Sequence, residues 1–311
     1  MRLISVVTPC YNEQDNVREV YERVKNVLAE CSGYCYEHIF IDNASQDKTV
    51  EILKDIAKHD QNVKIIVNAR NFGHLRSPYY GMLQAKGDAV ISIVSDLQDP
   101  PEMIKEFIKK WEEGYKIVVG VKPKSKESWL MAWWRRTGYH LITKLAEVPQ
   151  VKNFTGFGLY DKKVIDILRK LNDPYPYFRG LIAEIGFPIA EIPYVQPKRL
   201  HGKTKNNFYT LYDIALLGVT SNSKVPLRIM SLSGFALSVI SFLISLFFLV
   251  LKLIFWKTFS LGLAPILIGM FFFASVQLFF IGMLGEYIAA IHTQVLNRPL
   301  VIENERINFD K

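Results

Sequence analysis

Two long uncharged stretches near the C-terminal end constrain this chain more than any other feature. Between Ile229 and Gly285 the only charged side chains are Lys252 and Lys257. A helix that crosses about 30 Å of hydrocarbon needs roughly 20 apolar residues at about 1.5 Å rise per residue. Residues 231–251 and 263–284 meet this requirement, so we predict a hairpin of two transmembrane helices. A buried helical pair is the alternative, although such helices seldom lack a polar face over this length.

Charged residues are spread throughout the rest of the chain, as in a soluble domain, and this divides the chain into four parts. We predict a large domain at residues 1–205, an amphipathic interfacial helix and linker at 206–228, the two transmembrane helices at 229–290 and a tail at 291–311. The first apolar run is too short for a secretory signal, so we expect the large domain and the tail in the cytosol. The membrane would then be the plasma membrane, which is the inner membrane of a two-membrane cell. A short Leu-Val-Ile run at 300–302 is expected to pair with an edge strand of a neighbouring subunit.

The overall charge narrows the class of ligand. The formal net charge is +8, but no stripe of basic residues interleaved with aromatics accompanies it, so we expect no nucleic acid partner. A membrane surface or phosphorylated ligands explain the charge better. The three cysteines, Cys10, Cys31 and Cys35, do not complete a zinc site and are expected to be reduced.

Short β-branched runs alternate with longer amphipathic stretches in the first 120 residues. Strands are predicted at 3–7, 38–41, 63–67, 89–94 and 117–119, and helices at 16–30, 48–59, 77–86 and 101–113. This alternation predicts an α/β fold with a mostly parallel sheet and helices on both faces. Ligands of such sheets bind at the carboxyl ends of the strands.

Polar turns follow three of the predicted strands. Residues 8–13 are Thr-Pro-Cys-Tyr-Asn-Glu, residues 42–49 are Asp-Asn-Ala-Ser-Gln-Asp-Lys-Thr, and residues 95–101 are Ser-Asp-Leu-Gln-Asp-Pro-Pro. Helix capping explains any one of these turns taken alone. Together they place carboxylates around one crevice, where a cation or hydrogen-bond donors must balance the repulsion.

These turns resemble those of the family 2 inverting glycosyltransferases. The chain is most similar to the polyprenyl-phosphate glycosyltransferases, the group that contains dolichol-phosphate mannose synthase and the bactoprenol glucosyltransferases. The basic segment 199–205, the amphipathic stretch after it and the hairpin fit the same pattern, so the resemblance covers nearly the whole chain. It implies a nucleotide-sugar-binding fold of the GT-A type, with residues 1–205 as the catalytic domain.

The resemblance also implies a donor site at the strand ends. Pro9, Glu13, Asp42 and Asp96 would bind the UDP-sugar, and Asp96 with Gln98 would hold Mg²⁺ or Mn²⁺ at the diphosphate. A hard dication prefers oxygen ligands and neutralises charge that develops on a departing phosphate.

Two positions depart from the family pattern. Val94 replaces an aspartate of the commonest metal-binding motif, and Asp99 could partly substitute for it. Gly156 stands where many relatives carry an aspartate proposed as base. The acceptor, a lipid monophosphate, has a second pKa near 6 and is largely a dianion without help. Asp161 and Glu184 are the remaining candidates for a catalytic base or orienting carboxylate. Asp96 is the third residue predicted to be catalytic.

Cations are needed where two anionic substrates meet. The predicted phosphate-binding residues are Lys122, Arg135, Arg136, Arg199, Lys203 and Lys205. Guanidinium groups suit phosphate oxygens because they donate two parallel hydrogen bonds. A solvated basic loop beside an anionic membrane is the alternative for the last three.

The resemblance implies transfer of a hexose, with glucose favoured, from UDP to undecaprenyl or another polyprenyl phosphate at the cytosolic membrane face. The product would serve cell-envelope glycan modification. UDP-N-acetylglucosamine is the nearest alternative donor. A catalytically silent lipid-binding scaffold also stays open, whereas the lack of a Gln-x-x-Arg-Trp motif disfavours a processive polysaccharide synthase. Gln277, Gly282 and Gly285 in the second span favour a homo-oligomer, such as a tetramer.

Overall fold

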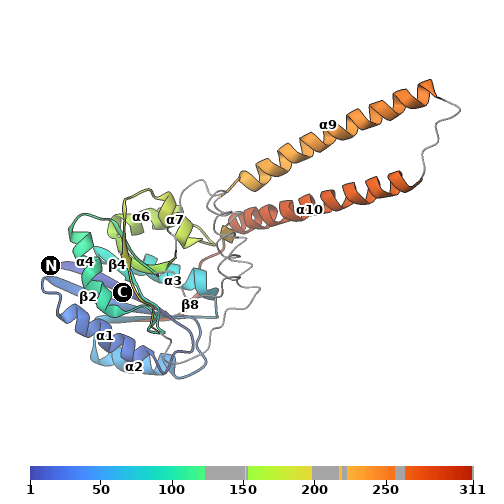
Figure 1. The fold of residues 1–311 in the computed structure, drawn as a ribbon. Coiled ribbons are helices and arrows are strands. Elements are labelled where there is room, and N and C mark those ends of the chain that lie inside the picture. Colours follow the sequence, from blue (N-terminus) through green and yellow to red (C-terminus); the bar gives the residue numbers. More distant parts are fainter. Residues whose placement is uncertain (123–150, 152, 198–216, 219–222, 256–262, 310–311) are drawn as a thin grey trace.

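The computed structural model describes residues 1–122, 151, 153–197, 217–218, 223–255 and 263–309. A sheet with helices packed against it forms the body of the molecule, and two long helices project from one side of it (Figure 1). The observed elements in the body are, in chain order, β1 (Arg2–Cys10), α1 (Val17–Ala29), β2 (Tyr34–Asp42), α2 (Thr49–His59), β3 (Val63–Asn68), α3 (Gly73–Gln84), β4 (Ala89–Ser92), η1 (Pro101–Met103), α4 (Ile104–Glu112), β5 (Ile117–Val121), β6 (Phe154–Asp161), α6 (Lys162–Leu171), α7 (Phe178–Glu184), β7 (Ile189–Pro193) and β8 (Glu303–Ile307).

The strands form one sheet in the order β7-β5-β6-β4-β1-β2-β3-β8. Strands β3, β2, β1 and β4 are parallel neighbours, as are β5 and β7. Strand β6 runs antiparallel between β4 and β5, and β8 runs antiparallel to β3. The predicted α/β fold with a mostly parallel sheet is therefore confirmed, with two antiparallel strands added to it.

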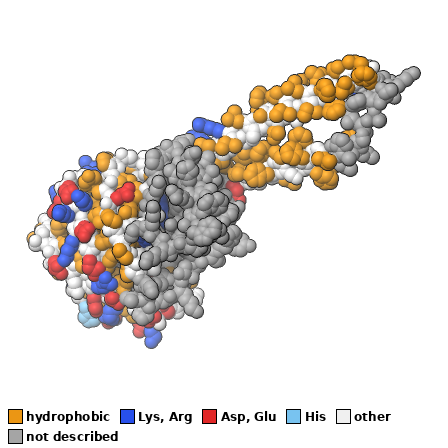
Figure 2. Space-filling model, in the orientation of Figure 1, with side chains coloured by type: hydrophobic (Ala, Val, Ile, Leu, Met, Phe, Trp, Pro, Cys, Tyr) orange, Lys and Arg blue, Asp and Glu red, His pale blue; other side chains and the backbone are white. Residues whose placement is uncertain are grey.

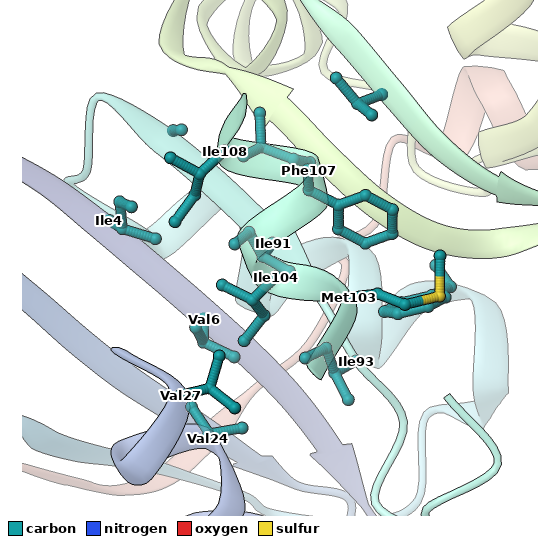
Figure 3. Packing of buried hydrophobic residues seen from close by; sticks show 14 of the residues in the cluster. Ile4, Val6, Val24, Val27, Ile91, Ile93, Met103, Ile104, Phe107 and Ile108 are labelled. Carbon is teal, nitrogen blue, oxygen red and sulfur yellow. The ribbon is translucent and has the colours of Figure 1, made fainter. Parts of the chain in front are cut away.

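Helices pack on both faces of the sheet and bury its hydrophobic side chains. On one face Ile4 and Val6 of β1 pack with α1 and α4, whose residues Val24, Ile104 and others form a buried cluster (Figure 3). Residues of α3, α6 and α7 form a second cluster on the opposite face, against β2, β5 and β6. Residues of α2 cover β2 and β3 in a third cluster. Successive side chains of a strand point to opposite faces, so strands buried on both faces are nearly continuous in apolar residues.

The C-terminal segment returns to the sheet of the same chain. The Ala69 amide after β3 donates to the Ile302 carbonyl at 2.8 Å, and β8 then pairs with β3. The Lys54 ammonium of α2 lies 2.5 Å from a Glu305 carboxylate oxygen. The tail therefore pairs with β3 of its own chain, and the expected contact of residues 300–302 with a neighbouring subunit stays a prediction.

The two projecting helices are α9 (Val225–Ile254) and α10 (Leu263–Leu296), which are long and apolar enough to cross a membrane. Apolar side chains cover most of their surface, whereas charged side chains lie on the body and near the helix bases (Figure 2). Leu232 is 71% exposed and Phe279 is 62% exposed, so the sheet body does not cover them. The chain leaves the body before α9 and rejoins its sheet at β8, so both ends of the hairpin lie on one side.

Candidate active site

The carboxyl ends of β2, β1 and β4 lie side by side, since these strands are parallel neighbours. Each is followed by a turn that contains one residue with a left-handed backbone, namely Asn12 (φ 55°), Ala44 (φ 62°) and Leu97 (φ 58°). Residues other than glycine seldom adopt this conformation, and such strain often accumulates at binding sites. The three polar turns predicted from the sequence therefore meet at one edge of the sheet.

Hydrogen bonds between the first two turns fix them against each other. The Asn12 amide donates to the Ser45 hydroxyl at 2.8 Å, and the Gln46 amide donates to the Asn12 side-chain carbonyl at 2.8 Å. The Glu13 amide donates to the Thr49 hydroxyl at 2.9 Å. These bonds satisfy backbone groups that would otherwise be orphaned at the strand ends.

Asp42 is fully buried at the end of β2. Its carboxylate accepts the Ser45 amide at 2.9 Å and also the Ser45 hydroxyl. Burial raises the pKa of Asp42, whereas the hydrogen bonds from Ser45 act against the rise. Asp42 therefore holds the second turn in place through Ser45. Of the other residues expected to bind the nucleotide, half-buried Pro9 lies beside Ile41, and a Glu13 carboxylate oxygen accepts from the Asn16 side-chain amide at 2.6 Å.

The third turn brings two acidic side chains together. The Gln98 amide donates to the Asp96 carboxylate at 3.1 Å, and Asp96 is 8% exposed. Asp99 is more deeply buried and accepts the Tyr194 hydroxyl, which follows β7, at 2.8 Å. Burial raises the pKa of Asp99 to about 6, to which the charge of Asp96 adds, while Tyr194 and Lys122 act in the opposite direction. The buried Tyr194, which follows the edge strand β7, thus holds the third turn in place.

Lys122 directly follows β5 and lies at the same edge. Burial lowers the pKa of its ammonium group, and Arg179 lowers it further, whereas Asp99 and Asp96 act to raise it. The structure therefore places a predicted phosphate ligand at the same edge as a predicted metal ligand, close enough for their charges to interact. Tyr194 contacts this site and the charge of Arg179 acts on it, but both were missed from the sequence, since neither stands in a motif.

The side chains of the third turn fit a hard divalent cation. Asp96 and Gln98 supply a carboxylate and an amide oxygen on one turn, and Mg²⁺ and Mn²⁺ prefer such ligands. Within the described parts of the chain, no group of three or more His, Cys, Asp or Glu converges. A cation held by Asp96 and Gln98 would therefore need oxygen atoms from a ligand to complete its coordination.

Asp161 lies at the opposite end of the sheet from Asp96, because β6 is antiparallel to β4 and ends beside the start of β4. Its carboxylate accepts the Lys163 amide at 3.0 Å, which caps α6, and the Trp111 indole N–H at 2.7 Å. Burial acts to raise the pKa of Asp161, but these two bonds and Lys116 hold it below its usual value. Asp161 is thus a helix cap at the end of the sheet remote from Asp96, and this geometry gives no support to the predicted catalytic role.

The other candidate carboxylate and the family departure at Gly156 can also be located. Glu184 ends α7 with its side chain exposed, and nothing in the described residues joins it to Asp96 or Lys122. Gly156 has φ +105°, a conformation strained for any other residue, and its carbonyl accepts the Tyr160 hydroxyl at 2.8 Å. The expectation that Glu184 acts as a base therefore gains no support from the geometry.

Five predicted phosphate ligands lie outside the described residues, namely Arg135, Arg136, Arg199, Lys203 and Lys205. The same holds for residues 206–216 and 219–222 of the predicted amphipathic helix and linker, whereas residues 217 and 218 are described, as helix.

The sheet order and the acidic strand-end turns define a class, the nucleotide-sugar-binding α/β fold of the GT-A type. Residues 5–168 match the profile of Glycosyl transferase family 2. The chain belongs to this family, as the resemblance of its turns predicted.

Several relatives match over nearly their full length. An uncharacterized glycosyltransferase of Bacillus subtilis is 35% identical over 99% of this chain and 97% of its own. A prophage-derived bactoprenol glucosyl transferase of Shigella flexneri is 33% identical over 96% of each chain. Among solved structures, the glucosyl-3-phosphoglycerate synthase of Mycobacterium tuberculosis is similar over 70% of this chain and 76% of its own, with 19% identity and a TM-score of 0.48.

Proposed function

We propose that this protein is a membrane-anchored hexosyltransferase that moves glucose, with inversion, from UDP-glucose to a polyprenyl phosphate such as undecaprenyl phosphate. The observation that carries the proposal is that Asp96, after β4, and Lys122, after β5, lie at one carboxyl edge of the sheet, in a chain that matches a bactoprenol glucosyl transferase along almost its whole length. The reaction would take place at the cytosolic face of the plasma membrane, with the glycolipid used for cell-envelope modification.

The donor would lie across the three strand-end turns. Asp96 and Gln98 would hold Mg²⁺ or Mn²⁺, which when bound neutralises charge on the departing UDP. Lys122 and Arg179 would place positive charge beside the diphosphate of the UDP-sugar donor. The buried Asp42 and Asp99 would hold the second and third turns in place through their hydrogen bonds with Ser45 and Tyr194, respectively.

The acceptor would attack without a protein base. A phosphate monoester is largely a dianion at neutral pH, so its oxygen is already a nucleophile. The displacement of Asp161 to the opposite end of the sheet supports this mechanism. Positioning and electrostatic stabilisation would then supply most of the catalysis.

Label transfer into lipid tests this proposal. The full chain in lipid vesicles would receive undecaprenyl phosphate, Mg²⁺ or Mn²⁺ and one radiolabelled donor at a time, including UDP-glucose and UDP-N-acetylglucosamine. We expect label from UDP-glucose in the organic extract, its loss with Asp96→Asn and its retention with Asp161→Asn.

The other outcomes each contradict a part of the proposal. Transfer from UDP-N-acetylglucosamine alone would replace the donor. UDP binding without transfer from any donor would contradict the acceptor, and the absence of both binding and transfer would favour a lipid-binding scaffold, an interpretation that Val94 and Gly156 keep open.

A further inference from the structure

Three arginines from separate segments gather where α10 meets the body. Arg70 follows β3, Arg76 lies in α3, and Arg298 follows the end of α10. The Arg76 guanidinium donates to the Pro299 carbonyl, which ties α3 to the chain leaving α10. The Arg70 and Arg76 guanidiniums lie 4.0 Å and 5.5 Å from the centre of the Phe72 ring.

Among the described residues, no carboxylate balances the positive charge of this arginine cluster. Within the described parts of the chain, none of the three arginines forms an ion pair, and the buried Nε of Arg76 has no hydrogen-bond partner. A buried donor without an acceptor costs free energy, as does the approach of like charges. Burial lowers the pKa of Arg76, and the charges of Arg70 and Arg298 lower it further.

Carboxylates close to the cluster in sequence or space are engaged elsewhere. A Glu303 oxygen lies 2.5 Å from the Arg306 guanidinium. The Asp173 carboxylate accepts the Gln294 side-chain amide of α10 at 2.9 Å and the Tyr175 amide at 2.9 Å. These contacts leave a concentration of guanidinium donors that suits an anion from outside the protein.

The position of the cluster identifies the source of that anion. Helix α10 has 34 residues, about 51 Å at roughly 1.5 Å per residue, so it is long enough to reach through the about 40–45 Å of a bilayer with its headgroups to the sheet body. Near its end Ile288, Ile291 and Val295 are spaced along one face and are 64%, 61% and 77% exposed. An exposed apolar stripe followed by arginine is typical of a helix end in the membrane interface.

We propose that Arg70, Arg76 and Arg298 form a binding site for the phosphate headgroup of an anionic phospholipid. The site lies beside β3, and β1 and β2 separate β3 from β4, a distance of about 14 Å at roughly 4.8 Å per strand. It is therefore apart from the turn of Asp96, although the Phe72 amide of the Arg70 loop donates to the Asn43 side-chain carbonyl in the turn after β2 at 2.9 Å. The inference does not depend on the proposed glucosyl transfer. It requires only that the hairpin lies in a membrane.

Guanidinium groups are suited to this ligand. Each presents parallel N–H donors to the two free oxygens of a phosphodiester, and Arg76 has an Nε–H without an acceptor. An occupied site would neutralise three like charges at once and fix the height of α3, and with it the donor edge, above the bilayer.

Native mass spectrometry of the full chain in detergent tests the site. Phosphatidylglycerol and phosphatidylcholine with identical acyl chains would be added separately, and retained lipid would be counted per protein. We expect phosphatidylglycerol to be retained, and at least fivefold less of it on Arg298→Gln and on the double variant Arg76→Gln/Arg298→Gln. Arg18→Gln is the control, because Arg18 is exposed and paired with Asp55 at 3.1 Å, remote from the hairpin.

Three results would overturn the proposal. Equal phosphatidylglycerol retention by the wild type and Arg298→Gln would show that the arginines do not hold the lipid. Displacement by millimolar inorganic phosphate would make the site one for free anions, and preferential retention of undecaprenyl phosphate would make it part of the acceptor site. Because Arg298 is exposed, its substitution leaves the fold intact, and lipid retention can be measured whether or not glucosyl transfer occurs.

Discussion

At the scale of single residues, burial and partners separate carboxylates that look alike in the sequence. Asp96 and Asp99 lie in the turn after β4, whereas Asp161 caps a helix at the other end of the sheet. The sequence predicted the turn of Asp96, because three polar segments at strand ends share one edge. It could not place Asp161, since β6 runs against its neighbours and a pattern of side chains does not reveal strand direction.

Asp161→Asn tests this separation. The variant loses one of the acceptors for Trp111 and Lys163, so we expect a loss of about 1–3 kcal/mol in stability. Metal-dependent UDP affinity should stay within about twofold of the wild type. Thermal unfolding and calorimetry would measure the two effects, and a stable variant with impaired turnover would instead restore the catalytic interpretation.

Buried His38 predicts acid sensitivity. Burial lowers its pKa to about 3, while the Thr8 hydroxyl lies 2.9 Å from Nε2 and Nδ1 has no partner. As the pH falls below about 6.5, His38 binds a proton in the unfolded chain but not in the folded one. The free energy of unfolding therefore falls by up to roughly 1.4 kcal/mol per pH unit, down to the pKa of folded His38.

His38→Gln should remove this contribution. Between pH 6.5 and 5 we expect its stability to fall by about 2 kcal/mol less than that of the wild type, measured from unfolding midpoints in detergent. His59→Gln is the control, because His59 is exposed on α2. Equal acid losses in the wild type and His38→Gln would contradict the account.

At the scale of elements, the sequence predicted the first five strands and the helices between them, because their hydrophobic periodicity is strong and each connection is short. Strands β6, β7 and β8 were not predicted. Strand β8 reads Glu-Asn-Glu-Arg-Ile, a polar edge strand whose pairing depends on β3. The predicted tail is thus partly a strand. Its backbone groups form hydrogen bonds with the edge of β3, and a local sequence pattern does not reveal such pairing.

Asn308→Ala tests how firmly this strand is attached. The Asn308 side-chain amide donates to the carbonyls of Ala57 and Val63, each at 2.9 Å. Its loss should cost about 1–3 kcal/mol and increase proteolysis of the C-terminal segment. Asn26→Ala, at an exposed position of α1, serves as the matched control. Unchanged stability and protease resistance would mean that β8 contributes little to the fold.

At the scale of the whole molecule, the hairpin interrupts one sheet. The chain passes from β7 through α9 and α10 to β8, so both ends of the hairpin must lie on the side of the sheet body. The segment after α10 meets the carboxyl edge of β3, where Ala69 bonds Ile302. A donor bound at this edge would therefore face the base of the hairpin, where a lipid phosphate would present itself.

This arrangement makes a topological prediction. Tags joined to the two chain termini should both be accessible to protease from the same side of sealed vesicles, because β1 and β8 belong to one sheet. Protection of one tag and digestion of the other would contradict the two-span arrangement.

The most direct test of the account is calorimetry of UDP binding to the full chain with and without Mn²⁺. The account predicts binding with the metal, at least tenfold weaker binding without it or with Asp96→Asn, and unchanged binding with Asp161→Asn. UDP affinity that depends on neither the metal nor Asp96 would contradict the claim that the acidic strand-end turns form the donor site.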